Sequence, residues 1–436
     1  MTKAALAVAV LSAALGAHAA EEPGQLYAGT AKADITPSAA DAIDLTNHKL
    51  NIQDHIYARV LVLKTDQTSL AIVSLDLILF GSEKVVADAK AKWGVDHVIL
   101  SSSHTHSGMA PKGLIIGGGQ PDWTRYRFDP REKVDWPGLS ADPWYAATEE
   151  KIVAAIGEAM KNLFPARIAI GRSPFESDYM AHNRRRVSKN GRVTMMWRNP
   201  SKVPTEPLDP QIRVIRVDDE AGKPRVVAVH YACHAVIQMH TGVLSRDYPG
   251  AAVDTIEDQM GEGCMGMFLQ GAEGDIDTYS VGVSGERGRE IAHKAGVSLG
   301  EAAARLAKKT VPKDRPENSL EVAERMVNIA YRSGRGSTDA CVTTAVINDA
   351  FALVSMPGEI FIQHQLDISE KSPLPETLIL GIAYSGRGCP FLIYVPTEQA
   401  VKEGGYGATE CSFVEPKAGK RMVNTALARI RAFLRN

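Results

Sequence analysis

The sequence predicts a single α/β domain built on a mixed sheet, and three observations lead to this class. Apolar runs of strand length alternate with helical segments along most of the chain. Some strands are joined by a short polar turn, whereas others are followed by a helix. The 436 residues, 44% hydrophobic and 23% charged, also have the composition of a soluble globular protein, with no clear linker or repeat.

The predicted strands share apolar runs that end in turn residues or in polar side chains able to bind a ligand. They are expected over residues 57–80 (two strands around a turn at 66–68), 96–108, 166–173, 191–199, 211–236 (two strands), 265–280 (one strand that enters a Gly/Asp loop), 342–361 (two strands), 376–386 and 391–400.

The predicted helices are recognised by their boundary residues. Gly94 stops the first helix, and Asp142 followed by Pro143 begins the second. The helices are expected over residues 82–94, 141–163, 250–260 and 285–309. Residues 110–145 are rich in Gly, Pro, Trp and Asp without a clear period, so we expect a long surface loop that could act as a lid.

The start of the chain predicts a secreted or periplasmic protein. Residues 1–20 combine one lysine, an apolar run of small residues and a small-residue cleavage site, as in a signal peptide. No later stretch approaches 18 uninterrupted apolar residues, so no stable membrane span is expected. The five cysteines are odd in number, so any disulfide pairing leaves one thiol over, and the pairing stays open.

Charge and composition narrow the class of partner. The formal net charge is −2 and no basic patch stands out, which argues against a nucleic-acid partner. A small-molecule substrate is expected instead, and the oligomeric state stays open.

Two of the 12 histidines lie one residue apart in the stretch LSSSHTHSGMAP, where a buried strand ends. Loops at the carboxyl ends of strands are where α/β sheets bind ligands. Because strand residues two apart share a face, His104 and His106 could reach one site, as two metal ligands or as one ligand and one acid or base. The alternative is a pair of polar residues in a surface loop.

Other strand ends carry residues of the same kind. His234 follows a strand, whereas His230 lies inside the apolar run and could be a hydrogen-bonded core residue. Glu359 follows a Pro-Gly turn, and Tyr394 lies beside a further strand end. Two histidines, a carboxylate and a phenol would suit zinc (Zn2+) and leave room for an activated water, although spacing alone does not show that they converge.

The order of nine short motifs resembles the neutral, or alkaline non-lysosomal, ceramidase family from about Tyr27 onward. The motifs are AGTAKADITP (28–37), SLDL (74–77), SSSHTHSG (101–108), NRRR (183–186), VHYACHA (229–235), SRDYPGAA (245–252), QGAEGD (270–275), MPGEIF (356–361) and YVPTEQAVKEGGYGAT (394–409). The resemblance implies that residues 21–436 are a zinc amidohydrolase domain, of the kind that cleaves the N-acyl bond of ceramide.

The resemblance also implies roles for individual residues. Four zinc ligands are implied: His104, His234, Glu359 and Tyr394. His106 would lie beside the scissile bond, and Arg184 and Tyr406 would bind the substrate carbonyl or the oxyanion. His240 and Asp247 border these motifs and could support the ligand histidines.

Two departures from the family alter the expected substrate. Asp277 stands where the ceramidases carry a serine, and the chain stops before their C-terminal domain. A carboxylate beside the zinc would suit a polar N-acyl compound, lipid- or sugar-derived, and either His106 or Asp277 would protonate the leaving amine. The same site could cleave an ester or a glycosidic bond, and a non-catalytic lipid- or sugar-binding protein is a further alternative.

Overall fold

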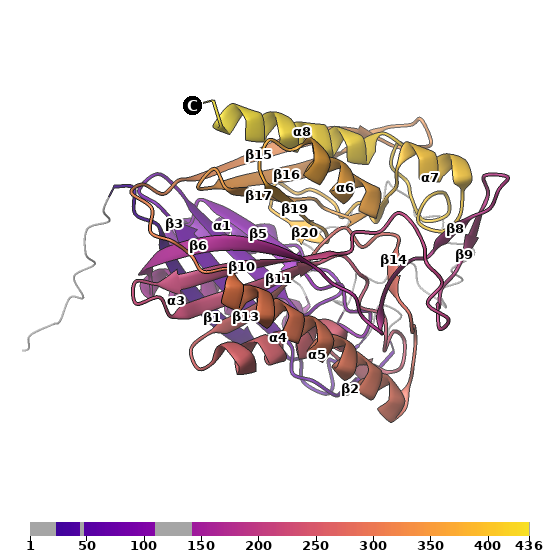
Figure 1. Cartoon of the computed structure of the whole chain (residues 1–436), viewed down its shortest axis with the longest axis horizontal. Helices are drawn as coiled ribbons and strands as arrows, with labels where there is room; N and C mark the ends of the chain where they lie inside the picture. Colours follow the sequence, from indigo (N-terminus) through magenta and orange to yellow (C-terminus); the bar gives the residue numbers. More distant parts are fainter. Residues whose placement is uncertain (1–22, 44–47, 110–141, 436) are drawn as a thin grey trace, which may run out of the picture.

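The protein has four layers, in the order helices, large sheet, small sheet, helices. The computed structural model describes residues 23–43, 48–109 and 142–435. The expected signal peptide (1–20) and residues 110–141 of the expected loop lie outside this range. Figure 1 shows α8 along the top of the molecule and α4 and α5 along the bottom, with both sheets between them. The α/β class is confirmed, and a second, smaller sheet packs on the expected mixed one.

The large sheet has nine strands in the order β13-β11-β10-β6-β1-β3-β4-β5-β20. The β4–β5 and β11–β13 pairs are parallel and the others are antiparallel, so the sheet is mixed. The strands are β1 (Tyr27–Asp34), β3 (Tyr57–Lys64), β4 (Ser69–Leu75), β5 (His97–Ser102), β6 (Phe164–Pro174), β10 (Gln211–Asp219), β11 (Pro224–Tyr231), β13 (Met265–Gln270) and β20 (Ala383–Tyr384).

Four helices cover one face of this sheet: α1 (Glu83–Trp93), α3 (Pro143–Lys161), α4 (Asp247–Met260) and α5 (Gly285–Lys309). Their boundaries follow the predicted signals. Gly94 ends α1 in the left-handed conformation (φ 69°), and the Asp142 side chain accepts a hydrogen bond from the Tyr145 amide at the start of α3. The helix expected from residue 250 begins earlier, at Asp247.

The second sheet fills the opposite face. It consists of β15 (Leu320–Ala330), β16 (Ser337–Ile347), β17 (Phe351–Ser355) and β19 (Glu376–Leu380). Phe351 and Leu353 of β17 share an apolar cluster with Leu61, Ile72 and Met267 of the large sheet. Its outer side is covered by α6 (Ile362–Lys371) and α8 (Ala418–Phe433). β15, α6 and α8 are not among the predicted elements.

The large sheet is curled, which brings distant strand ends together. The Ser74 hydroxyl of β4 donates a hydrogen bond to the Phe268 carbonyl of β13 (2.7 Å), although the two strands are far apart in the strand order. The loops after β5 and β11 are joined directly, since the His106 amide donates to the Ala235 carbonyl (3.0 Å). Two of the predicted histidine stretches therefore share one end of the molecule.

Short paired strands surround this end. They are β18 (Glu359–Ile360) with β21 (Tyr394–Val395), β7 (Met180–Asn183) with β14 (Ile276–Thr278), β8 (Arg185–Val187) with β9 (Val193–Met195), and β2 (Asn51–Ile52) with β12 (Val243–Leu244). The short helix α7 (Glu398–Glu403) follows β21. All five cysteines lie in the described part of the chain, and none of them forms a disulfide there. Among the described residues, we find no helix with both the length and the apolar character that crossing a bilayer requires.

Candidate metal centre

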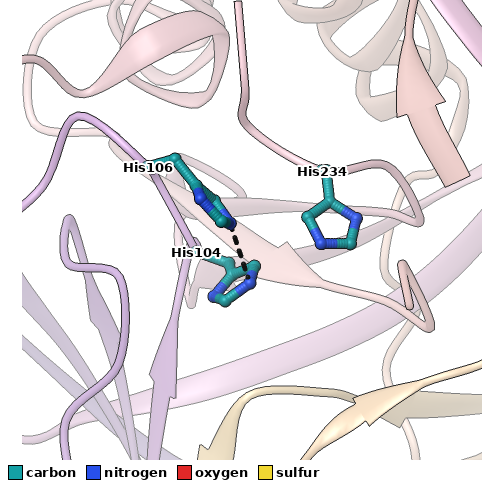
Figure 2. A group of neighbouring side chains, drawn as sticks. All are labelled: His104, His106 and His234. Carbon is teal, nitrogen blue, oxygen red and sulfur yellow. Dashed lines mark hydrogen bonds between the residues drawn. The ribbon is translucent and has the colours of Figure 1, made fainter. Parts of the chain in front are cut away.

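Two histidine side chains converge on one carboxylate oxygen. His104 Nε2 lies 3.5 Å from Glu359 Oε2, and His234 Nε2 lies 3.1 Å from the same atom. All three side chains are buried. Figure 2 shows the rings of His104 and His234 beside that of His106. Imidazole nitrogens and a carboxylate oxygen grouped in this way are the donors that zinc takes in proteins.

The backbone fixes which nitrogen each ring presents. His104 Nδ1 lies 2.7 Å from the Ile78 carbonyl oxygen, and His234 Nδ1 lies 2.8 Å from the Glu273 carbonyl oxygen. Because a carbonyl only accepts, each Nδ1 carries a proton, which leaves Nε2 as the nitrogen of each ring that can bind a metal. The two Nε2 atoms face Glu359, so both rings are oriented as ligands before any ion binds.

The backbone of His104 is held in an uncommon conformation. Its φ of 59° lies in the left-handed region, which costs a non-glycine residue roughly 1–3 kcal/mol. The His104 amide donates to the Leu77 carbonyl (3.0 Å), and with the bond to Ile78 this keeps the residue in place. Such strain at a buried histidine favours a functional role over a purely structural one.

His106 lies on the open side of the pair. Its Nε2 is 3.2 Å from His104 Nε2, and its ring centroid is 6.3 Å from that of His240. Burial, followed by the neighbouring His104 and His234, lowers the pKa of His106 well below its usual value. A neutral imidazole at this place can accept a proton during a reaction.

Strand pairing places Tyr394 beside Glu359. The two residues lie opposite each other in the parallel β18–β21 pair, and the Tyr394 phenol hydrogen-bonds to Glu359. Burial, together with the Glu359 carboxylate, raises the pKa of Tyr394 well above its usual value. Although burial acts in the opposite direction, His104 and His234 hold the pKa of Glu359 well below its usual range. The carboxylate is therefore charged and the phenol is protonated.

Arg184, between β7 and β8, brings a buried positive charge to the same place. Its carbon Cζ lies 5.3 Å from the ring centroid of Trp197 and 5.4 Å from those of Tyr394 and Tyr406. Its Nη2 donates to the Gly274 carbonyl (2.8 Å), whereas its Nε has no hydrogen-bond partner among the described residues. Trp197 is 43% exposed and lies against Tyr406, so this aromatic group reaches the surface.

Asp277 lies behind His234 and not on the side of the converging Nε2 atoms. Its Oδ1 accepts a hydrogen bond from Arg184 Nη1 (3.1 Å) and lies 3.6 Å from His234 Nδ1. The pairing of β14 with β7 brings Asp277 next to Arg184, which directly follows β7. The structure therefore associates this carboxylate with Arg184, and not with the position expected for an attacking water.

Glu273 is a member of this group that the sequence analysis misses. One of its carboxylate oxygens lies within 4.8 Å of a His104 ring nitrogen and a Glu359 oxygen. Burial, and then Glu359, raises the pKa of Glu273 well above its usual value. Its place in the loop that follows β13, three residues after Gln270, is a signal that could have found it, because the histidines also follow strands.

Comparison with solved structures shows which known proteins share this fold. The chain resembles a neutral ceramidase from Pseudomonas aeruginosa, with a TM-score of 0.68 and 16% sequence identity over 94% of this chain and 75% of that one. A structure described as a ceramidase complexed with C2 gives a TM-score of 0.70 at the same identity and coverage. The fold is that of these ceramidases. No protein-family model and no curated protein matches the sequence.

The ceramidase-like fold gathers most of the predicted site residues. His104, His106, His234 and Glu359 face one another, while Tyr394, Arg184 and Tyr406 pack beside them. His230 is a core residue, as its sequence position allowed, since its Nε2 lies 2.8 Å from the Ile379 carbonyl and burial lowers its pKa to about 4.

Asp247 was expected to support the ligand histidines, and the structure gives its side chain other partners. Its carboxylate accepts hydrogen bonds from the amides of Gln238 (2.8 Å) and Tyr248 (2.7 Å). The Tyr248 hydroxyl in turn donates to the Cys233 carbonyl (2.6 Å), directly before His234. Asp247 therefore orders the backbone around the site.

Proposed function

We propose that this protein is a zinc-dependent hydrolase that cleaves the amide bond of a small N-acyl compound. One observation carries the proposal: His104 Nε2 and His234 Nε2 converge on Glu359 in a ceramidase-like fold. When bound, zinc would polarise the substrate carbonyl and supply activated water at neutral pH. The ligands would be His104, His234, Glu359 and Tyr394.

The remaining side chains bind the substrate and move protons. Arg184 keeps an unpartnered Nε, so it can donate a hydrogen bond to the carbonyl oxygen as negative charge develops there. The proposal assigns the second donor to Tyr406, whose ring packs against Tyr394 at 5.4 Å between centroids. A donor of this kind contributes roughly 2.7–4 kcal/mol to a transition state. Neutral His106 accepts a proton and delivers it to the leaving amine.

The proposed substrate is more polar than ceramide. The support is Asp277, a carboxylate at the position where the ceramidases carry a serine, together with Arg184, which it pairs with. Charged groups next to a substrate favour amine, hydroxyl or sugar groups over an apolar chain, because desolvating a charge is costly. We also propose that the protein is secreted or periplasmic, on the basis of residues 1–20.

Metal analysis combined with a substrate screen tests this proposal. Purified protein should bind about one zinc per chain, and chelation should abolish turnover reversibly. N-acyl amino sugars, N-acyl amino acids and a short-chain ceramide, each with its ester analogue, form the screen, and His104→Ala is the inactive control. Faster cleavage of the ester analogues would reassign the bond, and a metal-free chain that only binds lipid or sugar would overturn the proposal.

A further inference from the structure

Glu273 is a buried carboxylate whose oxygens have no partner among the described residues. The side chain is 0% exposed, and neither Oε1 nor Oε2 takes part in a hydrogen bond. The nearby cation does not neutralise it by hydrogen bonding, because the Nη atoms of Arg184 donate to Asp277 and to the Gly274 carbonyl. An isolated buried carboxylate is costly, so buried charges in proteins are paired or coordinate metals.

The carboxylate is directed toward the centre by its surroundings. The Glu273 carbonyl accepts from His234 Nδ1 (2.8 Å), which anchors the residue next to the site. On the side-chain end, a Cβ added at Gly381 would lie 2.9 Å from Glu273 Oε2 and 2.7 Å from the Gly271 carbonyl oxygen. The absence of a side chain at Gly381 therefore leaves room for the carboxylate within 4.8 Å of His104 and Glu359.

These side chains form one metal site and not two. The side chains fall into two groups able to hold a metal, one formed by His104, His106 and His234, the other by His104, Glu273 and Glu359. His104 belongs to both, yet only its Nε2 is available, because Nδ1 is bonded to the Ile78 carbonyl. A second ion would be left with two carboxylates alone, so the groups overlap on a single centre.

We propose that Glu273 is an additional ligand of this centre, which then contains two carboxylates. The inference rests on the proposed function, since it concerns the same metal. A second carboxylate adds negative charge and raises the number of protein donors from four to five. Oxygen-rich donor sets suit ions that accept more than four ligands, such as Mn2+ and Co2+, better than a tetrahedral zinc site does.

Titration of the metal-free full-length protein with Co2+ tests the role of Glu273. The visible absorption of Co2+ becomes weaker as the number of ligands rises above four, so it reports coordination without any substrate. For the wild type we expect a weak spectrum, typical of a centre with more than four ligands, and the comparison with Glu273→Gln shows whether Glu273 is one of them. Glu273→Gln should bind Co2+ about tenfold or more weakly and give stronger absorption bands. Glu149→Gln is the matched control, because Glu149 is also buried but bonds to Ser82, outside the centre.

The outcomes separate this inference from the proposed function. A Glu273→Gln variant with wild-type affinity and spectrum would overturn the role of Glu273 while leaving the metal centre in place. A four-coordinate Co2+ spectrum of the wild type would also overturn the role of Glu273 as a ligand. A wild type that takes up no Co2+ would overturn both. Should circular dichroism show Glu273→Gln to be unfolded, Glu273→Asp replaces it, and wild-type affinity in that shortened variant refutes the inference.

Discussion

The ion pair between Arg184 and Asp277 supports the most direct test of the site's electrostatics. The two side chains are 4% and 2% exposed, and Arg184 Nη1 lies 3.1 Å from Asp277 Oδ1. Asp277→Asn keeps the shape and one oxygen acceptor but removes the charge. Arg184 is then left as a buried cation without its counter-charge, a situation that typically costs about 3–5 kcal/mol.

This loss is large compared with the stability of an ordinary domain, which is about 5–15 kcal/mol. Urea unfolding of the metal-free protein, followed by circular dichroism, measures it as a shift of the midpoint. Arg184→Gln and the double variant complete a double-mutant cycle. We expect the double variant to lose less than the sum of the single losses, by about 1–3 kcal/mol, because no charge is then left unpaired.

Two results would refute the reasoning about this pair. A loss below about 1 kcal/mol for Asp277→Asn is the range of an exposed pair and would mean that the two charges are not buried together. Strictly additive losses would mean that they do not interact. Asp277→Asn and Asp277→Ser should both retain the metal, because Asp277 lies behind His234. If either variant lowers kcat while KM stays constant, Asp277 acts in the chemical step and not in substrate binding.

Three further predictions follow from the site and its surroundings. His104→Ala and His234→Ala should each abolish stoichiometric metal binding while leaving the circular dichroism spectrum unchanged, and full zinc occupancy in either would contradict the ligand assignment. Gly274→Ala should weaken metal binding and lower the melting temperature, because its Cβ would lie 2.5 Å from the Glu359 carbonyl oxygen; wild-type behaviour would show that the loop moves aside. Burial raises the pKa of Asp247 from 3.8 to about 6, so the wild type should lose on the order of 3 kcal/mol of stability as pH rises through this window. Asp247→Asn should lack this step in unfolding measured at both ends of the window, and an unchanged step would assign it to another group.

Local pattern was enough to select the two histidines and the carboxylate that converge in the structure. His104 and His234 were recognisable because each follows an apolar strand, and Glu359 because it follows a Pro-Gly turn. The helix boundaries at Gly94 and Asp142 were predictable for the same reason, since a cap is decided by the residue itself and its nearest neighbours.

Glu273 and Asp277 show what local pattern did not reveal. They lie four residues apart in one loop and strand, yet Glu273 faces His104 and Glu359 while Asp277 faces Arg184. The Arg184–Asp277 contact joins residues 93 positions apart in the chain. Its geometry depends on the pairing of β7 with β14, and neither segment carries a strong strand signal.

The sequence by itself determined the α/β class, most of the strands and helices, and the residue types available for a metal centre, because these depend on periodicity, caps and strand-end chemistry. Only the tertiary structure decided which donors meet. The curl of the large sheet, held by Ser74 and Phe268, and the bond from His106 to Ala235 bring the loops after β5 and β11 together. These contacts are long-range, and their geometry follows from packing the whole chain around two sheets, which no single segment encodes.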